Sequence, residues 1–228
     1  MEKISGCIIV MNEEGKIARA IGNLRKFCDE VVVVDGGSRD GTVEAARKAG
    51  VIVFKNKWKD DFSAQRNFAM RKAKFLWIFM LDSDEEVTPE LGKKIKELIK
   101  QKNCKGFFIP RKNYIDGALV ESDAKLEMQP RLFIKTQRYI SAIHERPVDS
   151  DEFVISDFGR DEYIIHSKSS EMQRKHLIYQ KEIMEKSLKE AIDKDDKAEE
   201  KRMRNALEKW EVWWHDVNGN LSGKGEQK

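Results

Sequence analysis

The first hundred residues alternate between short apolar runs and segments with helical spacing. Uninterrupted apolar runs predict buried strands, whereas apolar residues three and four positions apart predict helices. The predicted strands are 4–11, 31–34, 51–54 and 75–81, and the predicted helices are 17–27, 42–49, 63–73 and 90–99. Strands that alternate with helices and are apolar on both faces predict a parallel sheet covered by helices on two sides.

After about residue 105 the pattern changes. Short strand-like segments in longer irregular connections, at 106–110, 131–135, 139–143 and 162–166, predict a mixed, partly antiparallel continuation of the sheet. From residue 169 the chain becomes helical and highly charged, and helices at 171–193 and 197–217 predict a helical hairpin. We therefore expect an α/β domain over 1–168, a C-terminal helical arm over 169–217 and a flexible tail over 218–228.

The second predicted helix of the arm carries an apolar stripe, formed by Met203, Leu207, Trp210, Trp214 and Val217. A stripe with this spacing more often packs on a partner helix than it binds a sugar or a membrane, so we predict packing within the chain. Trp213 lies off the stripe. A homodimer through the C-terminal helices, or contact with an acceptor domain, is the alternative use of this surface.

Composition narrows the possible partners. The 228 residues include 43 Lys and Arg against 40 Asp and Glu, which gives a net charge of +3. This balance lacks the basic excess that phosphate-backbone binding uses, so nucleic acid is not an expected partner. Three widely spaced cysteines predict neither a disulfide framework nor a zinc site. No apolar run approaches the roughly 20 residues that span a bilayer, and the N-terminus lacks signal-peptide features. We expect a cytoplasmic protein, with peripheral contact at the inner membrane face still open.

Polar residues follow the predicted strands at the points where ligands bind in an open α/β sheet. Asn12-Glu13-Glu14 follows the first strand, the Gly-rich segment 35–42 follows the second, and Asp82-Ser83-Asp84 follows the fourth. Carboxylates two residues apart on a strand point to one side, and they suit a hard divalent cation that also binds phosphates. The competing explanation is that these acids favour the N-terminus of the helix near Pro89.

The segment 35–42 has turn glycines that allow close backbone approach, followed by a helix whose N-terminal amides can bind an anion. It is neither a P-loop nor a dinucleotide-binding motif, because it contains no Gly-Lys-Ser/Thr and no GxGxxG. Asp35 could accept a hydrogen bond from a base imide or a ribose hydroxyl. An ordinary turn between a strand and a helix is an equally good explanation.

A family resemblance rests on four segments in this order and spacing: Asn12-Glu13-Glu14, Val33 through Thr42, Gln65-Arg66-Asn67, and Trp77 through Glu85. Together they closely resemble the family 2 glycosyltransferases with the GT-A fold, over roughly residues 1–100. Arg131-Leu132-Phe133 and Ile143-His144-Glu145 resemble the branch that includes lipopolysaccharide-core glucosyltransferases. The resemblance implies a mixed, mainly parallel sheet with helices on both faces. It also implies a nucleotide-diphosphate-sugar donor, Mn²⁺ or Mg²⁺, and usually inversion at the anomeric carbon.

The resemblance implies roles for individual residues. Asp35 would contact the nucleoside, Arg66 the ribose or diphosphate side, and Asp82 and Asp84 the ribose and metal. The expected donor-binding residues are Asn12, Glu13, Asp35, Gly37, Ser38, Arg66, Asp82, Ser83 and Arg131. Arg131 could clamp the phosphates or the sugar, or be a solvated arginine beside a strand. His166 matches a histidine that GT-A enzymes place beside the metal, so the expected ligands are Asp84, Asp82 and His166; a packed histidine is the alternative.

An inverting transfer needs a general base for the acceptor hydroxyl. Glu145 is the predicted base and forms the catalytic set with Asp84, while Asp123 and Asp157 remain candidates. A UDP-sugar is the favoured donor, and the acceptor could be a glycan, a lipid-linked group or a peptide. Two other functions stay open: a non-catalytic module that binds a sugar nucleotide or a partner, and a nucleotidyltransferase.

Overall fold

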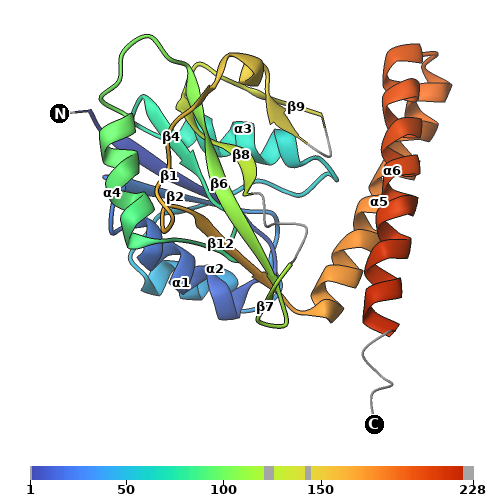
Figure 1. Ribbon diagram of the computed structural model, residues 1–228, viewed down its shortest axis with the longest axis horizontal. Helices are drawn as coiled ribbons and strands as arrows, with labels where there is room; N and C mark the ends of the chain where they lie inside the picture. Colours follow the sequence, from blue (N-terminus) through green and yellow to red (C-terminus); the bar gives the residue numbers. More distant parts are fainter. Residues whose placement is uncertain (1, 121–125, 142–144, 223–228) are drawn as a thin grey trace. The chain divides into compact units, whose positions relative to one another are not determined.

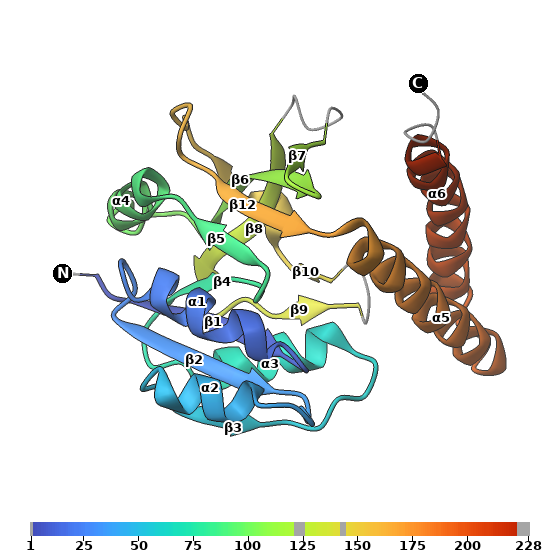
Figure 2. The same cartoon turned by 90° about the horizontal axis from the view of Figure 1, so that it is seen from below.

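The computed structural model describes residues 2–120, 126–141 and 145–222. The chain divides into two compact units, Met1–Ser169 and Ser170–Lys228. The first unit is built on a curved mixed sheet with helices on both faces, and the second is a hairpin of two long helices (Figure 1, Figure 2).

The N-terminal half of the first unit forms the parallel part of the sheet. Its strands are β1 (Ile4–Val10), β2 (Glu30–Asp35), β3 (Val53–Lys55) and β4 (Trp77–Met80), in the spatial order β3-β2-β1-β4. The crossovers contain α1 (Glu14–Leu24), α2 (Thr42–Lys48) and α3 (Phe62–Lys72). Helical crossovers are what parallel neighbours require, and the predicted alternation is confirmed. The loops after β1, β2 and β4 consequently lie at one edge of the sheet.

The sheet continues from β4 in the order β8-β6-β12-β5. The elements of this half are α4 (Pro89–Leu98), η2 (Ser150–Glu152), β5 (Glu85–Val87), β6 (Gly106–Ile115), β7 (Ala118–Leu119), β8 (Glu127–Ile134), β9 (Tyr139–Ile140), β10 (Arg146–Pro147), β11 (Val154–Ile155) and β12 (Ile164–Lys168). Strand β8 is antiparallel to β4 and β6, whereas β12 is parallel to β6 and antiparallel to β5. The predicted mixed continuation is therefore confirmed.

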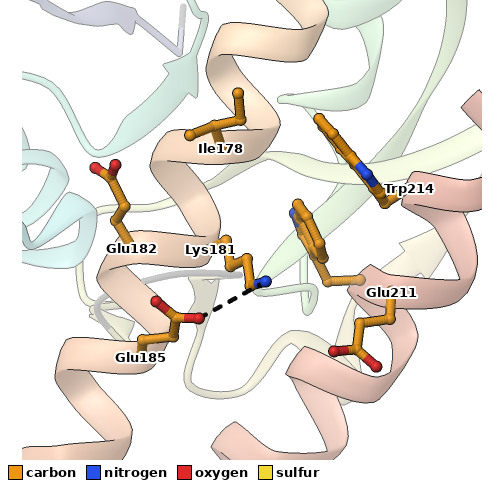
Figure 3. A pocket seen from close by; sticks show the side chains of 7 residues that line it. Ile178, Lys181, Glu182, Glu185, Glu211 and Trp214 are labelled. Carbon is orange, nitrogen blue, oxygen red and sulfur yellow. Dashed lines mark ion pairs between the residues drawn. The ribbon is translucent and has the colours of Figure 1, made fainter. Parts of the chain in front are cut away.

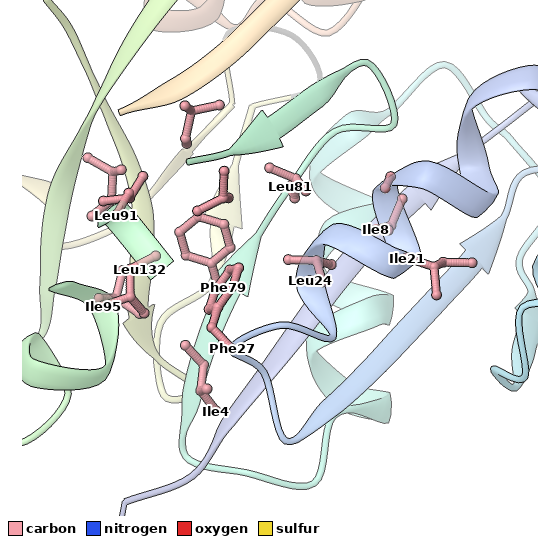
Figure 4. Close-up of a cluster of buried hydrophobic side chains, with 14 of the residues drawn as sticks. Ile4, Ile8, Ile21, Leu24, Phe27, Phe79, Leu81, Leu91, Ile95 and Leu132 are labelled. Atoms are coloured by element: carbon pink, nitrogen blue, oxygen red, sulfur yellow. The ribbon is translucent and has the colours of Figure 1, made fainter. Parts of the chain in front are cut away.

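Apolar side chains from both faces of the sheet form the core. Alternate residues of β1 point to opposite faces, so Ile4 and Ile8 belong to one cluster and Cys7 to the other. The first cluster packs under α1 and α4, which contribute buried residues such as Leu24 and Ile95 (Figure 4). The second packs under α3. This core fixes the strand ends from which the polar site is built.

Several predicted boundaries need correction, and three of them bear on the site or on the hairpin. No strand was predicted at 85–87, but these residues form β5, because backbone pairing with β12 compensates for the poor intrinsic strand character of Glu85 and Glu86. Strand β6 continues five residues past the predicted end at Pro110, because its polar second half still pairs with β8 and β12. Helix α6 (Lys197–Ser222) continues into the predicted tail 218–228. A single glycine costs a helix only about 1 kcal/mol, so Gly219 does not end it.

In the second unit, α5 (Ser170–Asp193) packs against α6. The indole Nε1 of Trp210 donates to the backbone oxygen of Leu177 at 2.9 Å, and Met203 is buried. Intrachain packing of the stripe is thus confirmed for Met203 and Trp210. The side chains of Trp213 and Val217 lie outside the described residues.

The hairpin also has a shallow cavity of about 600 Å³ (Figure 3). It is lined by Ile178, Lys181, Glu182, Glu185, Trp210, Glu211 and Trp214. The rings of Trp210 and Trp214 stack at 5.0 Å, and the Lys181 ammonium lies 4.8 Å from the Trp210 ring centre. Across residues 2–120, 126–141 and 145–222, no helix combines the length and the apolar character needed to cross a bilayer.

Candidate functional site

The loops after β1 and β2 are joined by hydrogen bonds between backbone and side chains. The amide of Asn12 donates to Ser38 Oγ at 2.9 Å, and the Asn12 side chain accepts from the Arg39 amide at 2.8 Å. The Glu13 amide donates to Thr42 Oγ1 at 2.8 Å. Asn12 adopts a positive φ of 57°, which asparagine tolerates better than most residues. These contacts hold the two predicted donor-binding loops as one surface.

Asp35 ends β2 and is buried. Its carboxylate accepts from the Gly37 amide at 3.0 Å and from the Ser38 amide at 3.1 Å. Gly37 has a φ of 114°, a conformation that residues with a Cβ rarely adopt. Asp35 therefore shapes the turn in which Gly37 and Ser38 lie, and it does so at the same sheet edge as the residues after β4.

Three consecutive side chains of helix α3 contact three different parts of the structure. Gln65 forms two hydrogen bonds with Asn56, which lies in the connection between β3 and α3. Asn67 binds β9, because its side chain accepts from the Tyr139 amide at 2.8 Å and donates to the Tyr139 carbonyl at 2.9 Å. Between them, Arg66 reaches the sheet edge. Its Nη2 lies 2.9 Å from Asp82 Oδ1 and its Nε lies 2.7 Å from Glu145 Oε1. Arg66 thus brings together two predicted site residues that are 63 positions apart in the sequence.

A chain of ion pairs, largely buried as far as Arg111 and partly exposed at Glu127, extends from Asp82 across the sheet. Arg131 Nη2 lies 2.7 Å from Asp82 Oδ2 and 2.6 Å from Glu85 Oε1, and Glu85 has no exposed side-chain surface. Arg111 continues the chain, at 3.0 Å from Glu85 Oε1 and 2.7 Å from Glu127 Oε2. Acids and bases alternate along it, so each buried charge faces an opposite one. Arg131 is therefore a buried residue that fixes Asp82.

Asp84 contacts different residues from Asp82, because the two lie in a turn between β4 and β5. Asp84 Oδ2 is 3.5 Å from His166 Nε2 and 3.5 Å from Lys168 Nζ. The pairing of β12 with β5, in which His166 is opposite Glu85, brings the histidine to this turn. Ser83 is buried between the two acids. Within this turn, each of the two carboxylates therefore has its own set of partners.

Asn113 orients the His166 ring. Its side-chain amide donates to Glu127 Oε2 at 2.9 Å, which leaves its oxygen facing His166 Nδ1 at 2.7 Å. Nδ1 therefore donates to Asn113, and Nε2 is left facing Asp84 Oδ2 at 3.5 Å. A doubly protonated ring donates from Nε2 to this carboxylate, whereas in the neutral ring the Nε2 lone pair can bind a cation. This arrangement is the one by which proteins orient histidine ligands for a metal.

Neighbouring residues lower the pKa values of both aspartates although both side chains are largely buried. Burial opposes ionisation of Asp82, yet Arg131 and Arg66 hold the pKa of its carboxyl well below the usual range. For Asp84, burial again raises the pKa, but the hydrogen bond with His166 and the charge of Lys168 outweigh it and lower the pKa. Asp82 in turn raises the pKa of Arg66 and Arg131 against the effect of their burial. All four groups are charged at neutral pH.

The donor set at Asp84 suits a metal that is shared with a substrate. Mn²⁺ accepts carboxylate and imidazole ligands, and such metals complete their shell with water and phosphate oxygens. Over the described parts of the chain, no cluster of three or more His, Cys, Asp or Glu side chains is arranged to hold a metal. Both oxygens of Asp82 bind arginines instead. The chain would therefore supply Asp84 and His166, with the remaining ligands coming from a phosphate and water.

Two buried guanidinium atoms, Arg66 Nη1 and Arg131 Nε, have no hydrogen-bond partner among the described residues. An unsatisfied buried donor costs free energy, about 1–3 kcal/mol by comparison with other proteins. Such groups are uncommon in native structures and require an explanation. Here both belong to arginines that bind Asp82, so the unsatisfied donors are concentrated at one point of the site.

Most of the residues predicted from the sequence lie at this sheet edge. Asp157 is exposed, and His144 and Asp123 lie outside the described residues. Sequence reasoning missed the residues that support the site: Glu85, Arg111, Asn113, Glu127 and Lys168. A signal was present, because Arg111 with Asn113, and His166 with Lys168, are spaced by two and share a face of β6 or β12.

Comparison with known proteins identifies a family and several relatives that this chain resembles. The family model described as glycosyl transferase family 2 matches residues 5–158. A TPR repeat-containing protein of Synechococcus elongatus is 33% identical over 60% of this chain and 34% of its own length. The lipopolysaccharide core biosynthesis glycosyltransferase LpsC of Rhizobium meliloti is 31% identical over 50% of this chain and 44% of its own.

The chain thus spans about a third to a half of the length of these curated relatives. Among solved structures, glucosyl-3-phosphoglycerate synthase of Mycobacterium tuberculosis, in complex with Mn²⁺, UDP-glucose and phosphoglyceric acid, aligns with a TM-score of 0.41 and 19% identity. It covers 50% of this chain and 44% of that one. The family model covers most of the first unit, whose mixed sheet with helices on both faces is the expected GT-A arrangement. The chain therefore belongs to glycosyl transferase family 2.

Proposed function

We propose that the chain transfers a sugar from a nucleotide-diphosphate donor to an acceptor hydroxyl, with a divalent metal and with inversion at the anomeric carbon. The observation that carries this proposal is the convergence of the Glu145–Arg66–Asp82 ion pairs and the Asp84–His166 pair at the carboxyl edge of the sheet. Family membership supports the reaction class. The same edge is where ligands bind in open α/β sheets.

The donor would span this edge. The joined loops of Asn12, Glu13, Asp35, Gly37 and Ser38 would hold the nucleoside, with UDP as the first candidate. The turn at Asp82, Ser83 and Asp84 would hold the ribose and diphosphate. Arg66 and Arg131 set the position of Asp82 and add positive charge beside the phosphates.

Mn²⁺ or Mg²⁺ at Asp84 and His166 would supply positive charge to the leaving diphosphate. The chain's own contribution is to hold those ligands: Asn113 orients the imidazole, and the ionised carboxylate of Asp84 stays available at neutral pH. A ligand set of one carboxylate and one histidine leaves the other coordination positions to phosphate and water.

Glu145 would act as general base. Its Oε1 accepts from Arg66, and no hydrogen bond reaches its Oε2 from the described residues, so this oxygen can accept the proton of the attacking hydroxyl. The acceptor oxygen bonds to the anomeric carbon as the bond to the donor phosphate breaks, and the nucleoside diphosphate leaves. The acceptor would be a glycan, a lipid-linked group or a peptide, and the reaction would take place in the cytoplasm or at the inner membrane face.

A thermal-shift panel tests the donor and the metal together. UDP-, GDP-, dTDP- and CDP-sugars are added with and without Mn²⁺, since a ligand that binds the folded state raises the melting temperature. We expect one nucleotide to give a metal-dependent shift that Asp84→Asn removes and that Glu44→Gln, an exposed carboxylate on α2, retains. Release of pyrophosphate from a nucleoside triphosphate, rather than nucleoside diphosphate from a sugar donor, would contradict the proposal.

A further inference from the structure

Lys168 is a largely buried lysine beside the pair proposed to hold the metal. Its Nζ lies 3.5 Å from Asp84 Oδ2, and the same oxygen lies 3.5 Å from His166 Nε2. Only 12% of the Lys168 side chain is exposed. His166 and Lys168 occupy alternate positions of β12, so both side chains leave the same face of the strand. The ammonium group is therefore held at the carboxylate by the backbone that also positions the histidine.

A lysine in this place affects a free cation and a donor in opposite ways. A divalent cation between Asp84 and His166 would lie within a few ångströms of the Lys168 ammonium, and repulsion between partly buried charges is weakly screened. The diphosphate of a donor reverses the balance, because its negative charge attracts both the metal and the ammonium. The same lysine thus opposes the metal alone and favours the metal together with a diphosphate.

We infer that Lys168 makes metal binding at Asp84 and His166 conditional on the donor: it weakens binding of the free cation and pairs with the donor phosphates once both ligands are present. The inference rests on the proposed function and assigns the order of loading at the same site. Coupling between two ligands is reciprocal, so Lys168 also makes donor binding depend on the metal. The site then resists occupation by a metal ion without its substrate.

Mn²⁺ titrations of the full chain, followed by the electron paramagnetic resonance signal of the free ion, test the first half of the inference. Without nucleotide, we expect Lys168→Met to bind Mn²⁺ about tenfold more tightly than the wild type, within the range of ordinary coupling between sites. Lys168→Arg keeps the charge and should match the wild type. Lys112→Met is the control for net charge, because Lys112 lies on the neighbouring strand β6 with its ammonium 3.8 Å from the Tyr163 ring centre.

Calorimetric titration of UDP, GDP, dTDP and CDP into protein saturated with Mn²⁺ tests the second half. We expect the nucleotide that binds the wild type to bind Lys168→Met about tenfold more weakly. Equal or weaker Mn²⁺ binding by folded Lys168→Met, or an equal gain in Lys112→Met, overturns the role of Lys168. If no nucleotide strengthens Mn²⁺ binding in the wild type, the proposed metal-dependent donor site itself fails, and the inference fails with it.

Discussion

Replacing Glu85 with glutamine tests whether the buried ion-pair chain holds the site together. The carboxylate accepts from Arg131 at 2.6 Å, from Arg111 at 3.0 Å and from the Asp82 amide at 3.0 Å, with no exposed side-chain surface. Glu85→Gln keeps the shape but removes the charge, and its amide nitrogen must face one of three donors. Breaking a buried pair on one side costs about 3–5 kcal/mol. At about 2–4 °C for each kcal/mol, the melting temperature should fall by roughly 6–20 °C.

Glu127→Gln is the matched control, because Glu127 binds the same Arg111 at 2.7 Å but leaves 39% of its side chain exposed. An ion pair this exposed is worth about 0–1 kcal/mol. Thermal unfolding by circular dichroism gives the shift for each variant, and hydrogen exchange of the β6 and β8 amides assigns it to the first unit. Equal losses for the two variants, or a loss below 1 kcal/mol for Glu85→Gln, would refute the reasoning.

Three further predictions address catalysis, acid stability and the hairpin. Glu145→Gln should reduce turnover about 10²- to 10⁴-fold with donor affinity retained, and steady-state kinetics alongside calorimetric donor binding would check this. Asp82 and Asp84 have lowered pKa values, so their stabilisation is fully present above the unfolded value of about 3.9 and is lost progressively as the pH falls from there through the lower folded-state values. Urea unfolding between pH 2 and 6 should therefore show a shallower pH dependence for Asp84→Asn. Trp210→Ala should destabilise the hairpin by about 3–5 kcal/mol, against less than about 0.5 kcal/mol for exposed Val212→Ala, measured by hydrogen exchange of α5 and α6.

The sequence predicted the parallel half of the sheet well, because β1, β2 and β4 are largely buried on both faces and therefore appear as continuous apolar runs. Strand β5 and the second half of β6 were missed for the opposite reason. Glu85 and Arg111 are charged, and their burial depends on partners that lie far away in the chain. Local pattern cannot predict a strand whose stability comes from ion pairs across neighbouring strands.

The residues of the candidate site also divide into those that could be predicted from their position in the sequence and those that could not. Acids that follow a strand, such as Asp82 and Asp84, could be found from position alone. Position alone did not identify their partners. Arg66, Arg131 and His166 were expected from the family resemblance, whereas Lys168 was not predicted, because it looks like an ordinary surface residue until the sheet is assembled. The C-terminal stripe was predictable because helical spacing is a local property, and Trp210 packs as expected.

The pairing of β5 with β12 also bears on how the protein folds. Glu85 and His166 are opposite each other in the sheet although they are 81 positions apart in the sequence. Contacts between distant residues form late, because closing a long loop has an entropic cost that nearby contacts do not carry. The parallel half, with its short crossovers, can therefore assemble first. The turn that carries Asp84 acquires its histidine and lysine only when the chain as far as Lys168 has been synthesised and docked, so the chemistry of the site appears at the end of folding.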